Sequence, residues 1–95
     1  MLNEPLSAGA AKKLVLEILA NGAVTYSRHA REEMADDDLA ELDVTNVLRA
    51  GRMKMPAEFE HGSWRYRIET ASMAVVIAFD SETHVIVVTA WRYKK

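Results

Sequence analysis

Two identical tripeptides concentrate recognition chemistry in the C-terminal half of the chain. Trp-Arg-Tyr occurs at residues 64–66 and again at 91–93, and the two copies contain both tryptophans and two of the three tyrosines. Arginine next to exposed aromatic rings is a common means of holding phosphates and stacking nucleic-acid bases. Each copy lies in a run with strand composition, where successive side chains point to opposite faces of a sheet. We therefore expect each arginine to face away from the two rings of its own copy.

His29 is the candidate for proton transfer. It lies in the segment Ser27-Arg28-His29-Ala30-Arg31, in the first turn of an expected helix, where the helix dipole favours the neutral imidazole. A neutral imidazole can act as a general base. The neighbouring acids Glu32 and Glu33 could orient the ring. The alternative is an ordinary surface histidine bonded to a carboxylate.

A second set of candidates consists of the guanidinium groups of Arg65, Arg67 and Arg92. If their strands lie close together, these groups share a surface and can hold a phosphodiester while charge develops at phosphorus. A metal-independent ribonuclease also needs a base for the 2′-hydroxyl and an acid for the leaving 5′-oxygen. Tyr93, beside Arg92 and two C-terminal lysines, is the candidate acid or stacking surface. The alternative is that Arg65 and Arg67 are a solvated strand face that pairs with Glu69.

No metal or cofactor site is expected. His29 and Glu33 have helical spacing, but no second pair of ligands accompanies them, and the chain contains no cysteine. No glycine-rich phosphate loop, nucleophile elbow or Ser-His-Asp order is visible in the sequence. The expected chemistry therefore relies on side chains alone.

The charge of the chain is divided unevenly along its 95 residues, although the net charge is only −2. Residues 1–48 contain four Lys and Arg against nine Asp and Glu, a net charge of −5, whereas residues 49–95 contain eight against five, a net charge of +3. An anionic ligand therefore fits the C-terminal half; two differently charged solvated surfaces are the alternative. Because no apolar run approaches about 20 residues and no export signal is visible, a cytoplasmic location without membrane contact is expected.

Three helices are expected in residues 7–51. The first two have Ser7 and Ser27 as N-caps, whose side chains accept hydrogen bonds from free amides of the first turn. For the third helix, Asp38 and Glu41 match a capping box with Asp in the Ser or Thr position. The expected limits of the three helices are residues 8–21, 28–35 and 39–50.

Strand patterns follow in residues 52–95. Alternating or apolar runs predict strands at residues 52–59, 64–70, 73–79 and 84–93. The last strand is expected to place Val85, Val87, Thr89, Trp91 and Tyr93 on one face. The whole chain, 1–95, therefore predicts a single α+β domain, in which about three N-terminal helices pack on one face of a roughly four-stranded antiparallel sheet.

Several short motifs resemble those of a small bacterial family of unknown function. The motifs span about residues 14–92 and are Ser27-Arg28-His29-Ala30 with Met34, Asp43-Val44, Val47-Leu48 with Gly51, and a final Val-Thr-Ala-Trp-Arg. Members of that family often lie beside zinc-finger antitoxins in toxin–antitoxin operons. The family looks like a distant branch of the RelE and barnase-like ribonuclease toxins. The resemblance therefore implies RNA lying across an antiparallel sheet that is packed on N-terminal helices.

The resemblance also implies roles for residues that stand in these motifs. His29 would be the leading polar residue of the site, Arg92 a phosphate or structural partner, and Met34 part of the core. Relatives usually have an arginine beside that methionine and Arg-Gly before the third helix, whereas this chain has Glu33 and Asp36-Asp37-Asp38. Loss of those basic residues weakens the case for RNA contact near the second helix, and an altered substrate or a lost activity are the alternatives.

We therefore expect a toxin-like domain that binds or cleaves RNA and has a cognate antitoxin protein as partner. The residues expected in catalysis are His29, Arg92 and Tyr93, and those expected to bind the substrate are Arg31, Arg65, Arg67 and Thr89. The alternative is a non-catalytic module that docks a partner protein on the aromatic and arginine surface, since Trp, Tyr and Arg also dominate interface hot spots.

Overall fold

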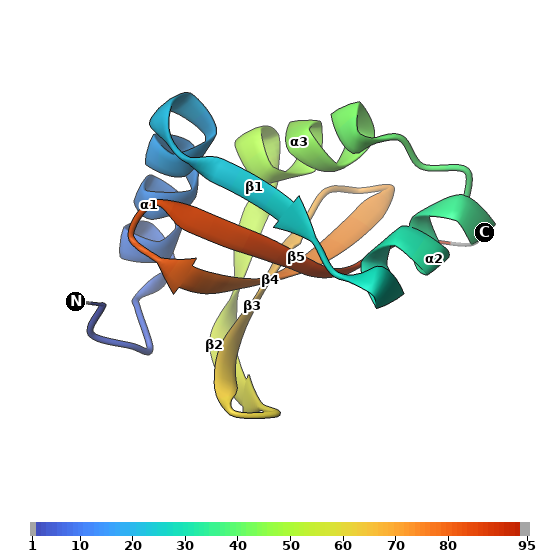
Figure 1. Ribbon diagram of the computed structural model, residues 1–95. Coiled ribbons are helices and arrows are strands. Elements are labelled where there is room, and N and C mark those ends of the chain that lie inside the picture. Colours follow the sequence, from blue (N-terminus) through green and yellow to red (C-terminus); the bar gives the residue numbers. More distant parts are fainter. Residues whose placement is uncertain (1, 94–95) are drawn as a thin grey trace.

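A computed structural model describes residues 2–93 as three helices and five strands (Figure 1). The helices are α1 (Ala8–Asn21), α2 (Arg28–Asp36) and α3 (Glu41–Ala50), and the strands are β1 (Ala23–Tyr26), β2 (Arg52–Glu60), β3 (Ser63–Glu69), β4 (Met73–Ser81) and β5 (His84–Arg92). The α+β class expected from the sequence is confirmed. Within this range, none of the helices combines the length and the hydrophobicity needed to cross a lipid bilayer.

All five strands belong to one mixed sheet with the order β1-β5-β4-β3-β2. Strands β2 to β5 form the predicted antiparallel meander. At one edge, however, β1 pairs in parallel with the first half of β5. The expectation of about four antiparallel strands was therefore wrong in both number and direction. The sequence predicts Ala23–Tyr26 only as a short extended piece and not as a strand of the sheet, because its pairing partner lies more than fifty residues away.

Helices α1 and α3 cover one face of the sheet, and α2 lies beside the second half of β5 (Figure 1). Apolar residues of α1 and α3, among them Ile18 and Leu48, are buried against Tyr66, Ile77 and Val87 of the sheet. This is the core of the domain. We call the face that α1 and α3 leave uncovered the open face.

The helix starts follow from their N-terminal hydrogen bonds. The side chains of Ser7 and Ser27 accept from amides three residues on, so both predicted N-caps are confirmed. The capping box expected at Asp38 was wrong, because α3 begins after Ala40, whose amide donates to the Asp43 carboxylate at 2.8 Å. Asp38 explains the shift: it has a positive φ of 54° in the turn that ends α2, where the amide of Leu39 donates to the carbonyl of Met34 at 2.8 Å, so it is not available to start α3.

A β-bulge in β5 changes which of its side chains share a face. The pairs Val76 with Thr89 and Ile77 with Val87 leave Val88 as an extra residue on β5. An extra residue reverses the alternation of the strand. Val87 therefore faces the core, whereas Thr89 and the residues that alternate with it face the open side. The expected common face for residues 85, 87, 89, 91 and 93 was wrong beyond the bulge.

Gly22 lies at the junction of α1 and β1, and its substitution tests how closely β1 packs against the start of β5. A Cβ added there would lie 2.3 Å from the carbonyl oxygen of Thr83, which accepts a hydrogen bond from Ala23 at 2.9 Å. Gly22→Ala must therefore displace one strand from the other, and we expect the free energy of unfolding in urea to fall by about 1–3 kcal/mol.

The matched control is Gly9→Ala in α1, where nothing lies within 4 Å of an added Cβ. Its stability should stay within about 0.5 kcal/mol of the parent or rise slightly, as for an open helical site. Equal stabilities of the two variants would contradict the close packing of β1 against the turn before β5.

Candidate functional site

The first Trp-Arg-Tyr copy turns its rings into the core. Tyr66 is fully buried, and Trp64 packs against the edge of the core. The Tyr66 hydroxyl accepts from the amide of Leu6 and donates to Glu4 Oε2, both at 2.9 Å, and burial raises the pKa of Tyr66 to about 12. Arg65, between the two rings, therefore faces the open side, where its Nε donates to a serine hydroxyl. In this copy, the arginine faces away from the two rings, as predicted.

The second copy has the opposite arrangement. Trp91 lies on the open face, where the guanidinium of Arg67 sits 4.9 Å from the centre of its ring. Arg92 pairs with Met73 across the strands, and its amide donates to Asp37 Oδ2 at 2.8 Å while its side chain lies 3.5 Å from the carbonyl of Asp38. Arg92 therefore does not join the other two arginines on one surface. The bulge in β5 is the reason, since it sends the tryptophan to the open face and the next residue away from it.

Four side chains around Arg67 form a hydrogen-bonded and ionic network, which we call the open-face cluster. Arg67 donates through Nε to Glu69 Oε2 at 2.9 Å and through Nη2 to the Tyr93 hydroxyl at 3.1 Å. Tyr93 in turn donates to Glu69 Oε2 at 2.7 Å. Lys54 Nζ lies 3.8 Å from the other carboxylate oxygen, and Trp91 stacks on Arg67. The pairing of Arg67 with Glu69, which the sequence offered as the alternative to a phosphate site, is thus present. Trp91, Tyr93 and Lys54 also contact this pair.

The electrostatics of the open-face cluster centre on its single carboxylate. The hydrogen bond from Tyr93 lowers the pKa of Glu69, and the positive charges of Lys54 and Arg67 lower it further against a partial loss of hydration. The hydrogen bond to Tyr93 also raises the pKa of Arg67. The cluster therefore places two basic side chains and a phenol around one carboxylate.

The strand register aligns the cluster with Thr89. Thr89, Val76, Arg67 and Lys54 are successive partners across β5, β4, β3 and β2. Because neighbouring strands lie about 4.8 Å apart, the Cα atoms of Thr89 and Arg67 are separated by about 10 Å. In the next row, Arg52 stands opposite Glu69. A strip of cations, hydroxyls and one indole therefore crosses the open face from β5 to the β2 edge.

His29 lies on one flank of α2. Arg31 lies on the opposite flank, which faces α3. Its Nη1 binds Glu41 of α3 at 2.6 Å, and its guanidinium lies 4.5 Å from the centre of the Tyr26 ring. On a helix, residues 29 and 33 project roughly opposite Arg31. His29 is two thirds exposed, and its Nε2 lies 3.2 Å from Glu33 Oε1. The structure thus exposes His29 on the flank of α2 opposite Arg31, and within residues 2–93 its one side-chain contact is with Glu33 of the same helix.

Sequence reasoning missed the contributions of Lys54 and Arg52. Both lie on a strand that Pro56 marked as irregular, and their alternation with Met53 was the available signal. It also missed the contact between Arg67 and Trp91, which depends on the bulge. Within residues 2–93, no group of three or more His, Asp or Glu side chains is arranged to hold a metal ion.

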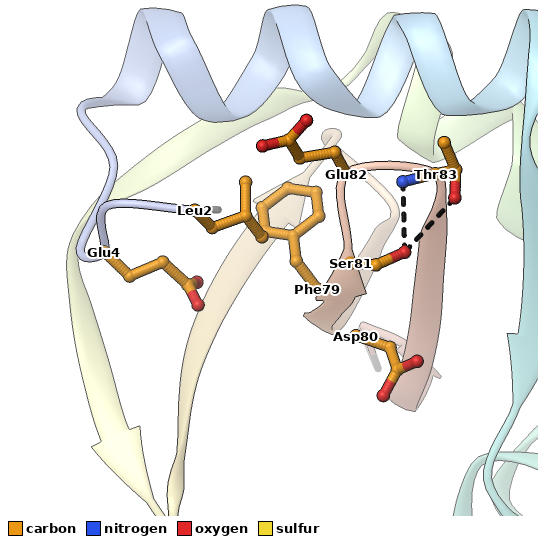
Figure 2. A pocket seen from close by; sticks show the side chains of 7 residues that line it. All are labelled: Leu2, Glu4, Phe79, Asp80, Ser81, Glu82 and Thr83. Carbon is orange, nitrogen blue, oxygen red and sulfur yellow. Dashed lines mark hydrogen bonds between the residues drawn. The ribbon is translucent and has the colours of Figure 1, made fainter.

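A hollow at one end of the molecule is not part of this site. It lies between the N-terminal segment and the β4–β5 turn and is lined by Leu2, Glu4, Phe79, Asp80, Ser81, Glu82 and Thr83 (Figure 2). Its ionisable lining groups are carboxylates, which repel anions. A phosphate-bearing ligand therefore fits the open-face cluster and not this hollow.

Comparison with known proteins gives one match. The model of a protein family described as a domain of unknown function (DUF4258) matches residues 26–92, from the end of β1 to the end of β5. The matched range contains His29, Arg67, Thr89 and Trp91. No curated protein and no solved structure gives a significant match to the chain.

Tyr93→Phe should raise the pKa of Glu69, because it removes the hydrogen bond that contributes most to lowering it. In the folded parent that pKa is depressed, so the stabilising contribution of Glu69 is present above its ordinary value of 4.5 and is lost as the pH falls through the lower folded value. An NMR titration of the Glu69 side-chain carboxyl carbon measures the shift.

The matched control is Tyr26→Phe, which removes a phenol that faces α3 and not the open-face cluster. It should leave the Glu69 titration unchanged. A Glu69 pKa that is the same in Tyr93→Phe as in the parent would contradict the network described above.

Proposed function

The chain belongs to the DUF4258 family, and we propose that it binds single-stranded RNA on the open face of its sheet and cleaves it without a metal ion, as the toxin-like component of a bacterial toxin–antitoxin pair. The observation that carries the proposal is the Arg67–Trp91 pair, a cation over an indole on the face that α1 and α3 leave uncovered. The resemblance to RelE and barnase-like toxins also implies that RNA lies across a sheet that is packed on N-terminal helices.

In the proposed RNA complex, the phosphate binds N–H groups that make no hydrogen bond within the protein. Arg67 has five N–H donors, of which one at Nε and one at Nη2 are engaged, so its guanidinium can still hold a phosphate oxygen. Lys54 lies beside Arg67 in the same cross-strand row, and Thr89 offers a hydroxyl in that row. Arg65 lies two residues before Arg67 on β3 and adds a further positive charge. Trp91 and Tyr93 provide ring faces for stacking a base. This combination suits a polyanion that also carries flat rings.

Cleavage is assigned in this proposal to His29, the exposed histidine of α2. In the proposed step His29 accepts the proton of the 2′-hydroxyl, and the 2′-oxygen attacks phosphorus. Arg67 stabilises the charge that develops on the phosphate oxygens, and Tyr93 donates its proton to the leaving 5′-oxygen. The products are a 2′,3′-cyclic phosphate and a 5′-hydroxyl. The phenolate that remains is held by the same guanidinium and recovers a proton, through water, from the protonated His29, which restores both groups.

Arg31 and Arg92 have no part in this scheme, because they lie off the open face. Arg31 joins α2 to α3 through Glu41, and Arg92 fastens the end of β5 to the turn after α2. Their proposed roles are therefore structural.

Docking of a partner protein is the second candidate function, and one observation favours it. Phe59 is 60% exposed and stacks edge-on against Trp64 where the β2–β3 hairpin extends from the body of the domain (Figure 1). An exposed aromatic pair is typical of an interface anchor. The salt dependence of binding separates this function from RNA binding.

Binding to a fluorescent single-stranded RNA of about ten nucleotides tests the main proposal. Arg67→Gln and Trp91→Ala should each weaken binding by about tenfold or more, since a charged hydrogen bond or a stacked base contributes about 1–3 kcal/mol. The binding constant should fall with salt at a logarithmic slope of about −2 for three phosphate contacts. Arg49→Ala is the control: this exposed arginine lies at the end of α3, in the opposite layer, and should change affinity less than twofold.

Parent protein that shows no RNA binding at low salt, or equal affinities for Arg67→Gln and Arg49→Ala, would exclude the open face as an RNA surface. Binding to a partner protein that barely responds to salt would favour the docking function instead.

His29→Ala should separate cleavage from binding. Loss of a general base lowers the rate by about 100-fold or more, while RNA affinity should stay within about threefold because the open-face cluster is intact. Cleavage is followed by gel electrophoresis of the labelled RNA, and growth after induction provides a second readout. Arg28→Ala is the matched control, since its side chain is 94% exposed and pairs only loosely with Glu32 at 3.6 Å. Equal cleavage rates in both variants would rule out His29 as the base.

A further inference from the structure

Thr25, His84 and Asp80 form a second hydrogen-bonded set at the other end of the open face. His84 Nε2 lies 2.7 Å from Thr25 Oγ1, and His84 Nδ1 lies 3.2 Å from Asp80 Oδ2. Thr25 and His84 are 59 residues apart in the chain and meet only because β1 pairs in parallel with β5. Asp80 is the extra residue of a second irregularity, between the pairs of Phe79 and Ser81, which aims its carboxylate at the histidine. Three separate segments thus converge on one imidazole.

The chemistry of the three groups fixes the direction of their hydrogen bonds. A carboxylate can only accept, so Nδ1 of His84 must carry the hydrogen that Asp80 binds. In the neutral imidazole Nε2 is then an acceptor, and the Thr25 hydroxyl must donate to it. A carboxylate, an imidazole and a hydroxyl in this order are the arrangement that activates a hydroxyl for nucleophilic attack. In this tautomer the proton of Thr25 points at the base that would remove it.

The surroundings of Thr25 leave room for a substrate. Thr25 is exposed on an edge strand, and its neighbours in the same row of the open face are the apolar side chains of Ile86 and Ala78. The amides of Ala23 and Ser27 bond to carbonyls on the β5 side, so the amide of Tyr26 points away from β5, at the free edge. An N–H directly after the nucleophile is a suitable donor to a developing oxyanion.

Figure 2 shows the Asp80 side chain directed away from Leu2 and Phe79, which line the neighbouring hollow. Asp80 thus borders the hollow and also contacts His84 at 3.2 Å, so the hollow adjoins this set and shares Asp80 with it.

We propose that Thr25 is a nucleophile, activated by His84 and Asp80, that hydrolyses small carboxylic esters. Thr25 Oγ1 attacks the carbonyl carbon and its proton passes to His84 Nε2. The ester C–O bond then breaks, and the departing alcohol takes that proton. Water attacks the resulting acyl-threonine ester through the same histidine, which releases the carboxylic acid and restores the hydroxyl. This activity is independent of RNA binding and uses none of the groups of the open-face cluster.

p-Nitrophenyl acetate is the probe that tests the proposal. The parent protein should release p-nitrophenolate and carry an acetyl group on Thr25, located by mass spectrometry of peptides. Thr25→Ala should abolish this acetylation, and His84→Ala should slow it by about 100-fold or more. Thr25→Ser should keep it, since a serine hydroxyl replaces the threonine hydroxyl. The matched control is Thr83→Val: the Thr83 hydroxyl contacts Ser81 and not His84, so acetylation of Thr25 should continue at the parent rate.

Three results would overturn the proposal: no acetyl on Thr25 of the folded parent, unchanged release by Thr25→Ala, or unchanged acetylation in His84→Ala. Unchanged release without Thr25 would mean that the imidazole alone hydrolyses the ester. Circular dichroism of each variant establishes that it is folded. Thr25→Ala should bind RNA like the parent, so failure of the esterase proposal and failure of the RNA proposal are separate outcomes.

Discussion

The β-bulge at Val88 is the constraint on which the rest of the open face depends. The Ser27 hydroxyl donates to the Val88 carbonyl at 2.8 Å and accepts from the first-turn amide of Ala30, so one side chain both starts α2 and holds the extra residue of β5. Without the extra residue, Trp91 would turn toward the helices and Arg92 toward the open face. The cation–ring contact of Arg67 would then be lost. The bulge at Val88 and the hydrogen bond from Ser27 that holds it thus determine which side chains form the site.

Local chemistry made the helices and the meander predictable. Ser7, Ser27 and Gly51 mark helix ends through hydrogen bonds within a few residues, and alternation marks β3 and β4. By contrast, β1 becomes a strand only by pairing with residues 84–87, and the bulge exists only relative to β4. No local pattern encodes either feature. The start of α3 was missed because Asp38 has a left-handed conformation in the turn that ends α2, which its sequence neighbours do not reveal.

The candidate site also contains some features that local sequence predicts and others that depend on long-range pairing. Burial of Tyr66 below an outward Arg65 follows from simple alternation and was foreseen. The exchange of roles between Trp91 and Arg92 was not, because alternation was carried through the bulge. Lys54 entered the site through cross-strand register, which a single sequence does not reveal. Residue types therefore pointed to the half of the chain that contains the open-face cluster, whereas the membership of the cluster required long-range pairing.

The acids after α2 show how architecture and charge are connected. Relatives were expected to carry basic residues there, but Asp37 uses its carboxylate to accept the amide of Arg92 at the outer edge of β5. Together with the bond from Ser27 to Val88, this occupies edge groups of β5 that β1 is too short to reach, and so protects an edge that could otherwise pair with another chain. An acid suits this purpose and an arginine does not, since an amide needs an acceptor. Positive charge for an anionic ligand must then come from β2 and β3, where Lys54, Arg65 and Arg67 stand.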